Sequence, residues 1–253
     1  MSRAANLLFA IICYAIFFAT FLYLIAFVGG FGLVPRTVDT GPAAAPAVAA
    51  IIDIALIALF GLQHSIMARP GFKKKWKRVI PAVTERSVFV LTASIALMIL
   101  FLGWRPIGTV VWDVTTPALA GVLWAIFWIG WVTVLISTFL INHFELFGLQ
   151  QAWFHARGHA EPPAPELREP SLYRVVRHPM MAGFFLAFWG TPQMTAGHLL
   201  LAIGMSAYIL IALHYEERDL VSLFGADYED YRRRVGMLVP RFRSSGGRSK
   251  IRT

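Results

Sequence analysis

Long apolar blocks alternate with short polar segments along the whole chain. A helix of about 20 residues crosses the hydrocarbon core of a bilayer, which is roughly 30 Å thick. Four blocks each predict one membrane span: about 4–28, 47–67, 87–103 and 117–141. A fifth and final block, about 180–215, is interrupted at Gly190-Thr191-Pro192, which predicts two helical legs. The first of these legs is short, and either begins near Ser171 or enters only part of the bilayer.

The pattern therefore predicts an all-α, polytopic helical membrane protein with four spans plus a C-terminal helical hairpin. Of the 253 residues, 57% are hydrophobic and 15% are charged, whereas soluble domains carry about 25% charged residues. High hydrophobicity also excludes a disordered chain. A single cysteine, Cys13, excludes an internal disulfide framework and a cysteine-based zinc site.

Basic residues are distributed unequally among the connections. The segment after the second block, 68–86, holds seven, residues 142–179 hold four, and the segment after Tyr215 holds nine. The connections after the first and third blocks hold one each, Arg36 and Arg105. The positive-inside rule then places both termini on the cytoplasmic side of a bacterial-type cytoplasmic membrane. The net charge of +9 predicts contact with anionic lipids rather than nucleic acid.

Exposed material is concentrated on that cytoplasmic side, so we expect a cofactor pocket there. Residues 1–141 form the N-terminal transmembrane helices. Residues 142–253 form a cytoplasmic loop, the hairpin and a C-terminal segment for cofactor binding, and both parts belong to one integrated domain. The sequence leaves the oligomeric state open.

A polar cluster flanks the hairpin. Arg177 and His178 precede it, and Glu216 and Glu217 follow it. Because a hairpin returns its ends to one membrane face, we expect these four side chains to lie together. They offer a cation for a carboxylate and carboxylates for an ammonium group, which suits a zwitterionic amino-acid ligand. An internal salt-bridge cluster that caps two helices is the alternative.

Aromatic residues continue the pattern after the hairpin. Phe224, Tyr228 and Tyr231 recur near helical spacing and therefore share one face. Residues 232–234 are three arginines, typical of an amphipathic helix that contacts lipid headgroups. Tyrosine on the apolar face can pack its ring against a purine while its hydroxyl finds a polar partner.

Together, Arg177-His178-Pro179, the Glu216-Glu217 pair and the segment 220–240 resemble the C-terminal signature of the isoprenylcysteine carboxyl methyltransferase and phospholipid methyltransferase superfamily. The resemblance implies an integral-membrane enzyme that uses S-adenosyl-L-methionine. Met181 departs from the pattern, since the family often has a tyrosine there. By the same resemblance, the cofactor is bound by Tyr173, Arg177, His178, Glu216, Glu217, Tyr228 and Tyr231.

The N-terminal half narrows the resemblance. The segments 61–70, 85–87, 104–106 and 142–150 are similar to those of bacterial methanethiol S-methyltransferases, which are related to NnrU-like membrane proteins. This implies methyl transfer to the sulfur of methanethiol, a small thiol, giving dimethyl sulfide and S-adenosylhomocysteine. A lipid or prenylcysteine substrate is one alternative. A haem-associated or transport protein of the NnrU type is another.

Such a reaction benefits from a general base that deprotonates the thiol, because small thiols are largely protonated at neutral pH. Asn142 and Glu145 are three residues apart and share a helical face. His143 looks onto the neighbouring face, and His64 lies near the same depth in the second span. We expect these four residues to be catalytic, although a bond to backbone or headgroups would equally explain His64, and an ion pair would explain Glu145.

The sequence does not predict a metal site, although one segment has part of a suitable pattern. His155 and His159 have helical ligand spacing, with His143 and Glu161 nearby. Gly158 and the prolines that follow interrupt this segment, and a closed ligand set is missing.

Overall fold

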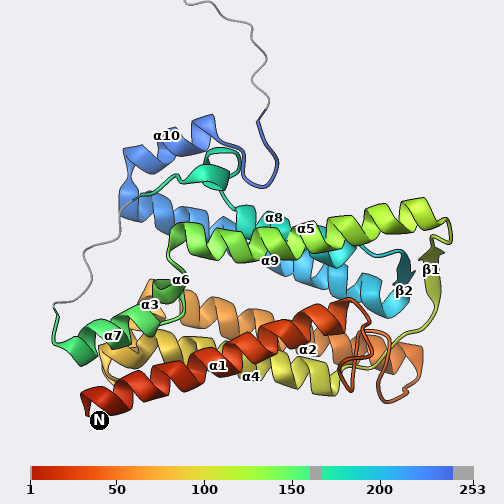
Figure 1. The fold of residues 1–253 in the computed structure, drawn as a ribbon, viewed down its shortest axis with the longest axis horizontal. Helices are drawn as coiled ribbons and strands as arrows, with labels where there is room; N and C mark the ends of the chain where they lie inside the picture. Colours follow the sequence, from red (N-terminus) through yellow and green to blue (C-terminus); the bar gives the residue numbers. More distant parts are fainter. Residues whose placement is uncertain (1, 160–166, 242–253) are drawn as a thin grey trace, which may run out of the picture.

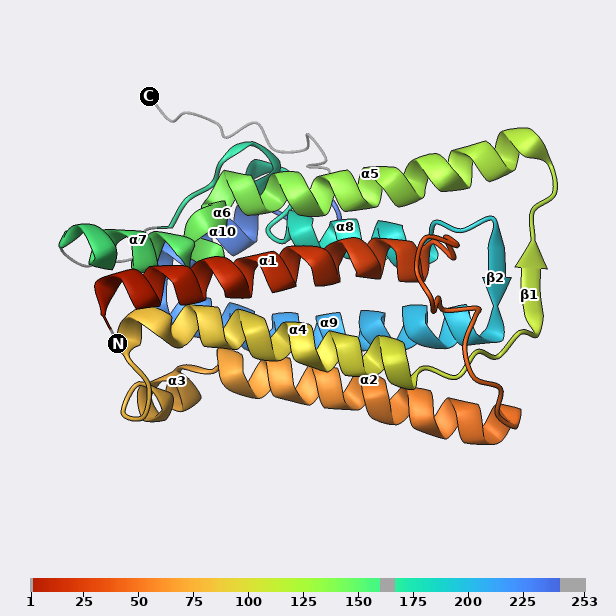
Figure 2. The ribbon, with the colours of Figure 1, turned by 60° about the horizontal axis from the view of Figure 1, so that its bottom comes forward.

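The computed structural model describes residues 2–159 and 167–241, which form an elongated bundle of helices (Figures 1 and 2). Within this part of the chain, five helices are long and apolar enough to cross a membrane. The protein is therefore an all-α polytopic membrane protein, as the hydrophobic pattern predicts. The five long helices are α1 (Arg3–Val28), α2 (Pro46–Ala68), α4 (Glu85–Gly103), α5 (Pro117–Ile141) and α9 (Ala196–Phe224).

Helix ends fall within two residues of the predicted limits of the first four spans. Pro46 and Pro117 occupy the first turn of α2 and α5, where the missing N–H costs no hydrogen bond. Ser2 caps α1, and its side chain accepts a hydrogen bond from the Ala5 amide. Local chemistry thus sets where these helices begin.

The predicted hairpin is present, and its first leg is short. Helix α8 (Pro179–Trp189) has 11 residues, or about 16 Å, roughly half of a hydrocarbon core. The chain continues to strand β2 (Gln193–Thr195), which pairs antiparallel with β1 (Val110–Asp113) after α4. The leg begins at Pro179, because residues 171–174 form a separate 3-10 turn, η2 (Ser171–Arg174).

Short elements gather at the opposite end of the bundle from the β1–β2 pair (Figure 1). Both the N-terminus of α1 and the C-terminus of α9 lie at this end, which we call the basic end (Figures 1 and 2). An even number of crossings follows, as the charge distribution predicts. The short elements are α3 (Pro70–Trp76), η1 (Ala82–Thr84), α6 (His143–Leu146), α7 (Leu149–Arg157) and α10 (Ala226–Arg234).

Many large apolar side chains point outward from the bundle. Ile51, Leu62, Leu119 and Ile211 are each more than half exposed, although they belong to the long helices. Exposed apolar side chains on this scale are expected where lipid, rather than water, surrounds the protein. The outer surface of the helices thus contacts membrane lipids.

Helices α5 and α8 approach one another through glycine. A Cβ atom on Gly130 of α5 would lie 2.6 Å from both the Ala187 nitrogen and the Gly183 oxygen of α8. A Cβ on Gly183 would lie 2.7 Å from the Gly130 oxygen. Gly183 and Ala187 are four residues apart, the spacing of small residues that permits close packing of membrane helices. This contact packs α8 closely against the middle of α5.

Alanine at Gly130 is predicted to destabilise the bundle. Its Cβ has no room against the α8 backbone, so we expect a loss of roughly 1–3 kcal/mol, as overpacking typically causes. Thermal unfolding of the purified protein in detergent measures it. Gly121→Ala is the matched control on the same helix, because a Cβ there meets nothing within 4 Å. An unchanged melting temperature for Gly130→Ala would contradict the close packing.

Candidate active site

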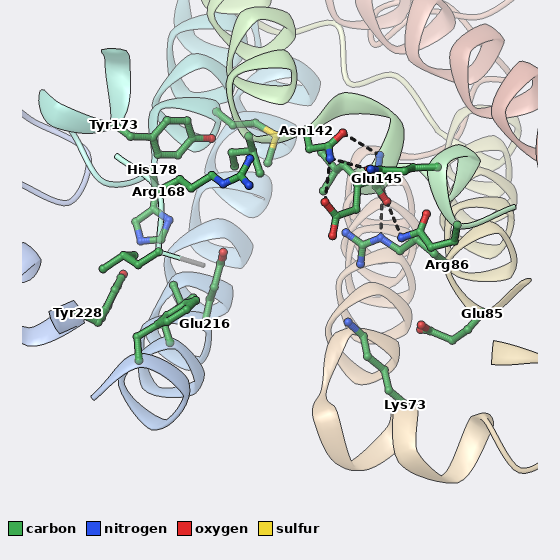
Figure 3. A pocket seen from close by; sticks show the side chains of 18 of the residues that line it. Lys73, Glu85, Arg86, Asn142, Glu145, Arg168, Tyr173, His178, Glu216 and Tyr228 are labelled. Atoms are coloured by element: carbon green, nitrogen blue, oxygen red, sulfur yellow. Dashed lines mark hydrogen bonds between the residues drawn. The ribbon is translucent and has the colours of Figure 1, made fainter. Parts of the chain in front are cut away.

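A cavity of about 800 Å³ lies at the basic end of the bundle. Its size is within the range of pockets that bury small-molecule ligands. Two groups of side chains face each other across it (Figure 3). The tyrosine wall comprises Tyr173, His178, Glu216 and Tyr228, and the Asn142 wall comprises Lys73, Arg86, Asn142 and Glu145.

A buried carboxylate, that of Glu217, stands behind the tyrosine wall. Its Oε1 accepts hydrogen bonds from Arg177 Nε at 2.7 Å and His178 Nε2 at 3.2 Å, and the Tyr228 hydroxyl donates to it at 3.5 Å. Its Oε2 lies 3.3 Å from Arg232 Nε. Glu217 is 7% exposed and does not line the cavity. The structure thus makes Glu217 a support for Arg177 and His178, where the sequence predicted a direct cofactor contact.

The segment after α10 fixes the same pair through its backbone. The amides of Arg177 and His178 donate to the carbonyls of Gly236 and Met237, at 2.8 and 3.1 Å. The Arg177 guanidinium also donates to the Val235 carbonyl. Arg177 and His178 still line the cavity, so the predicted cluster serves as an internal ion network and as part of the wall.

Glu216 lies one residue earlier on α9 and faces the cavity instead. Successive helical residues are rotated by about 100°, so the two glutamates of the pair point in different directions. The half-buried Glu216 carboxylate makes no hydrogen bond or ion pair with any other residue of the described chain. It therefore has hydrogen-bonding capacity left for a ligand.

Three tyrosines complete this side. Tyr228 and Tyr231 are buried on one face of α10, as their spacing predicts, and both line the cavity with Tyr173. The Tyr231 hydroxyl donates to the Tyr173 carbonyl at 2.6 Å. Burial raises the pKa of Tyr231 to about 12 and also raises the pKa of Tyr173 and of Tyr228. All three hydroxyls are consequently protonated at physiological pH.

On the opposite wall, Asn142 organises the turn between α5 and α6. Its Oδ1 accepts from the Glu145 amide at 3.2 Å, which caps α6. Its Nδ2 donates to Glu145 Oε2 at 2.9 Å and to Gln150 Oε1 at 2.6 Å. Asn142 and Glu145 both line the cavity, so they share one face as their spacing indicates.

His143, however, points away from the cavity. Its Nε2 lies 2.8 Å from the Tyr14 hydroxyl of α1, and its Nδ1 lies 2.8 Å from Thr138 Oγ1. Its ring stacks on Phe139 with centroids 4.2 Å apart, and burial lowers the pKa of the imidazole. The structure thus places His143 outside the cavity lining, and its catalytic role stays a prediction. The cap at Asn142 starts a new helix and turns the next side chain toward α1.

His64 also lies outside the cavity. Its ring packs between Phe60 and Phe89, with centroids 5.5 and 4.9 Å away, and it is absent from the cavity lining. Its Nδ1 has no hydrogen-bond partner within the described residues. His64 lies near the basic end, as expected, but its side chain faces the interior of the bundle, outside the cavity lining. Its catalytic role stays a prediction.

The segment weighed as a metal site lies at the rim of α7. His155 and His159 line the cavity, but α7 ends at Arg157 and Gly158 adopts a left-handed conformation with φ 72°. Glu161 lies outside the described residues. In residues 2–159 and 167–241, no three His, Cys, Asp or Glu side chains are grouped to hold a metal ion.

Sequence reasoning missed two cations of the Asn142 wall. Lys73 of α3 and Arg86 of α4 both line the cavity (Figure 3). They belong to the basic connection that indicated membrane orientation. Arg86 also stands in the segment 85–87, whose resemblance to known methyltransferases was the available signal.

Comparison with known proteins identifies relatives that cover most of the chain. The sequence model of the family described as "NnrU protein" matches residues 53–237. The chain is 51% identical to "Methanethiol S-methyltransferase" of Mycobacterium tuberculosis, over 95% of this chain and 98% of that protein. It is 50% identical to "Methanethiol S-methyltransferase 2" of Bradyrhizobium diazoefficiens, over 95% of this chain and 92% of that protein.

A more distant relative is "Nurim" of Bos taurus, 31% identical over 66% of each chain. No solved structure matches the chain. The similarity to the bacterial enzymes runs through all five long helices and the cavity between them. The chain therefore belongs to the NnrU family, in the group of the bacterial methanethiol S-methyltransferases.

Proposed function

We propose that the protein transfers a methyl group from S-adenosyl-L-methionine to the sulfur of methanethiol, giving dimethyl sulfide and S-adenosylhomocysteine. The methanethiol assignment rests on the names of relatives that match 95% of the chain. The assignment of the methyl donor rests on the cavity itself. Arg177, His178, Glu216, Tyr228 and Tyr231 of the methyltransferase signature all line this one cavity, whose volume suits a nucleotide-sized ligand.

The tyrosine wall fits the groups of this donor. Glu216 offers an unpaired carboxylate for ribose hydroxyls or an ammonium group. Arg177 and His178 add positive and polar groups that suit a carboxylate. Tyr173, Tyr228 and Tyr231 add aromatic rings for the nucleoside, while their hydroxyls donate hydrogen bonds within the protein. Glu217 holds Arg177 and His178 from behind. When bound, S-adenosyl-L-methionine supplies an electrophilic methyl group on a positively charged sulfur.

Positioning is the main task left to the protein. An in-line displacement needs the nucleophile, the methyl group and the leaving sulfur aligned, and a cavity wall on each side of the reacting atoms provides that. Asn142 and Glu145 face the tyrosine wall and, in this proposal, contact the thiol. His143 and His64 act behind the walls through packing, because their rings lie outside the cavity.

We place the basic end on the cytoplasmic side of the bacterial membrane. Lys73, Lys74, Lys75 and Lys77 all lie on or beside α3, at the cavity end of the bundle, and cytoplasmic loops carry the excess of basic residues. The cavity is then on the side where a nucleotide-derived donor is made. Both described ends of the chain lie on that side as well.

Incubating the purified protein with methyl-labelled S-adenosyl-L-methionine and methanethiol tests the function. We expect labelled dimethyl sulfide in the headspace. Label in copurified lipid with no volatile product would support a lipid or prenylcysteine substrate instead. A visible haem absorption band with neither product would favour the haem-associated alternative.

Substitution of Glu216 tests the donor site. Because Glu216 makes no bond within the described chain, Glu216→Gln should leave the melting temperature unchanged and lower the affinity for S-adenosylhomocysteine at least tenfold, as loss of a charge-assisted hydrogen bond would. Isothermal calorimetry measures the affinity. Asp227→Asn is the matched control, an exposed carboxylate that does not line the cavity. Wild-type affinity in Glu216→Gln would remove this residue from the site.

A further inference from the structure

Two cations of the Asn142 wall have no role in donor binding. Lys73 and Arg86 line the cavity on the side opposite His178, Glu216 and Tyr228 (Figure 3). Lys73 belongs to α3 and Arg86 to the first turn of α4. Lys77, just after α3, also lines the cavity but is exposed, whereas Lys74 and Lys75 are exposed and lie outside the lining. Lys73 and Arg86 are therefore the two less exposed cations of this wall.

Arg86 is held in a fixed orientation. Its Nε donates to the Leu146 carbonyl at 2.7 Å, and its guanidinium lies 5.4 Å from the centre of the Phe89 ring. These contacts anchor one edge of the guanidinium. In the part of the chain that the structure describes, its terminal Nη1 and Nη2 groups make no hydrogen bond to protein, so their donors remain for a ligand. Three carboxylates, those of Glu85, Glu145 and Glu216, interact electrostatically with this guanidinium.

Lys73 is a half-buried amine whose side chain points into the cavity (Figure 3). Its Nζ has no hydrogen bond or ion pair with any described residue. Burial lowers its pKa first, and the charges of Arg86, Lys77 and Arg69 lower it further, while Glu85 opposes them. A lysine with a lowered pKa is a better proton acceptor near neutral pH than an exposed one.

The charges of the two reactants favour this wall for the thiol. The donor carries a positive sulfur, so cations would repel it from the Asn142 wall, and the free carboxylate of Glu216 would attract it to the other wall. A thiolate is an anion and has the opposite preference. Carboxylates (Glu85 and Glu145) also line the Asn142 wall, and arginines (Arg168 and Arg177) also line the opposite side, so the preference is local. The thiolate is favoured beside Lys73 and Arg86, and the positive sulfur is favoured beside Glu216.

We infer that Lys73 and Arg86 form the subsite where the thiol is ionised and held, an assignment that rests on the proposed function. The deprotonated form of Lys73 takes the S–H proton and becomes an ammonium group, and Arg86 stabilises the resulting thiolate. The thiolate sulfur forms a bond to the methyl carbon as the bond between that carbon and the donor sulfur breaks. The electron pair of the broken bond stays on the donor sulfur, and Lys73 then releases its proton to water.

Lys73→Met tests the assignment because it keeps the length and apolar stem of the side chain but removes the amine. We expect kcat/KM for methanethiol to fall roughly 100-fold at neutral pH, within the range for loss of an acid–base group. The affinity for S-adenosylhomocysteine and the melting temperature should stay unchanged. The deficit should shrink as the pH rises, because methanethiol then ionises in solution.

Lys74→Met on the same helix is the matched control, since Lys74 is exposed and does not line the cavity. Lys73→Arg places a permanent positive charge there and cannot accept the proton, so it should bind methanethiol but leave kcat as low as in Lys73→Met. A deficit equal at every pH would indicate a structural role and overturn the inference, as would lost affinity for S-adenosylhomocysteine. An active wild type with a fully active Lys73→Met contradicts this inference alone. A wild type that forms no dimethyl sulfide contradicts the proposed function.

Discussion

The buried carboxylate of Glu217 is the interaction on which the cavity depends. A carboxylate removed from water is tolerated only when it is paired and hydrogen-bonded. Here it receives Arg177 and His178 from the start of α8 and Arg232 from α10. Three segments that are far apart in the sequence are thereby joined at one point. Removing one partner of such a buried pair typically costs about 3–5 kcal/mol, because the other charge is left unpaired.

The same interaction separates the roles of the two adjacent glutamates. Helical geometry places Glu216 and Glu217 on different faces of α9, so only one can join the ion network. Glu217 is satisfied within the protein, and Glu216 is left facing the cavity. The doubled glutamate at this position thus supplies one carboxylate to the ion network and one to the cavity wall. The sequence shows the pair, but only the packing of α8 and α10 distinguishes its members.

Much of the fold could be predicted from the sequence, because the bilayer restricts the choice. Every backbone polar group in lipid must be bonded within its own helix, so an apolar block of sufficient length has one possible structure. Proline at the start of α2 and α5 then fixes where each helix begins. The short α8 was also predictable, since Pro179 and Gly190 bound it. The close packing of α5 against α8 was not predictable, because the hydrophobic pattern alone does not show that Gly130 packs against Gly183.

Side-chain direction was harder to predict than position. Apolar pattern and charge gave the depth of His64 and His143 in the bundle, but the direction of each ring depends on helix rotation and on the cap at Asn142. Lys73 and Arg86 were hidden for a related reason. The sequence of a lysine-rich connection does not show whether its charges face water or a cavity. The positive-inside rule also gave a sufficient explanation for the lysines. Because α3 turns Lys73 inward beside Arg86, residues of the basic segment from which the membrane orientation was predicted also line the cavity. In the proposed function, topology and chemistry therefore draw on the same cluster of basic residues.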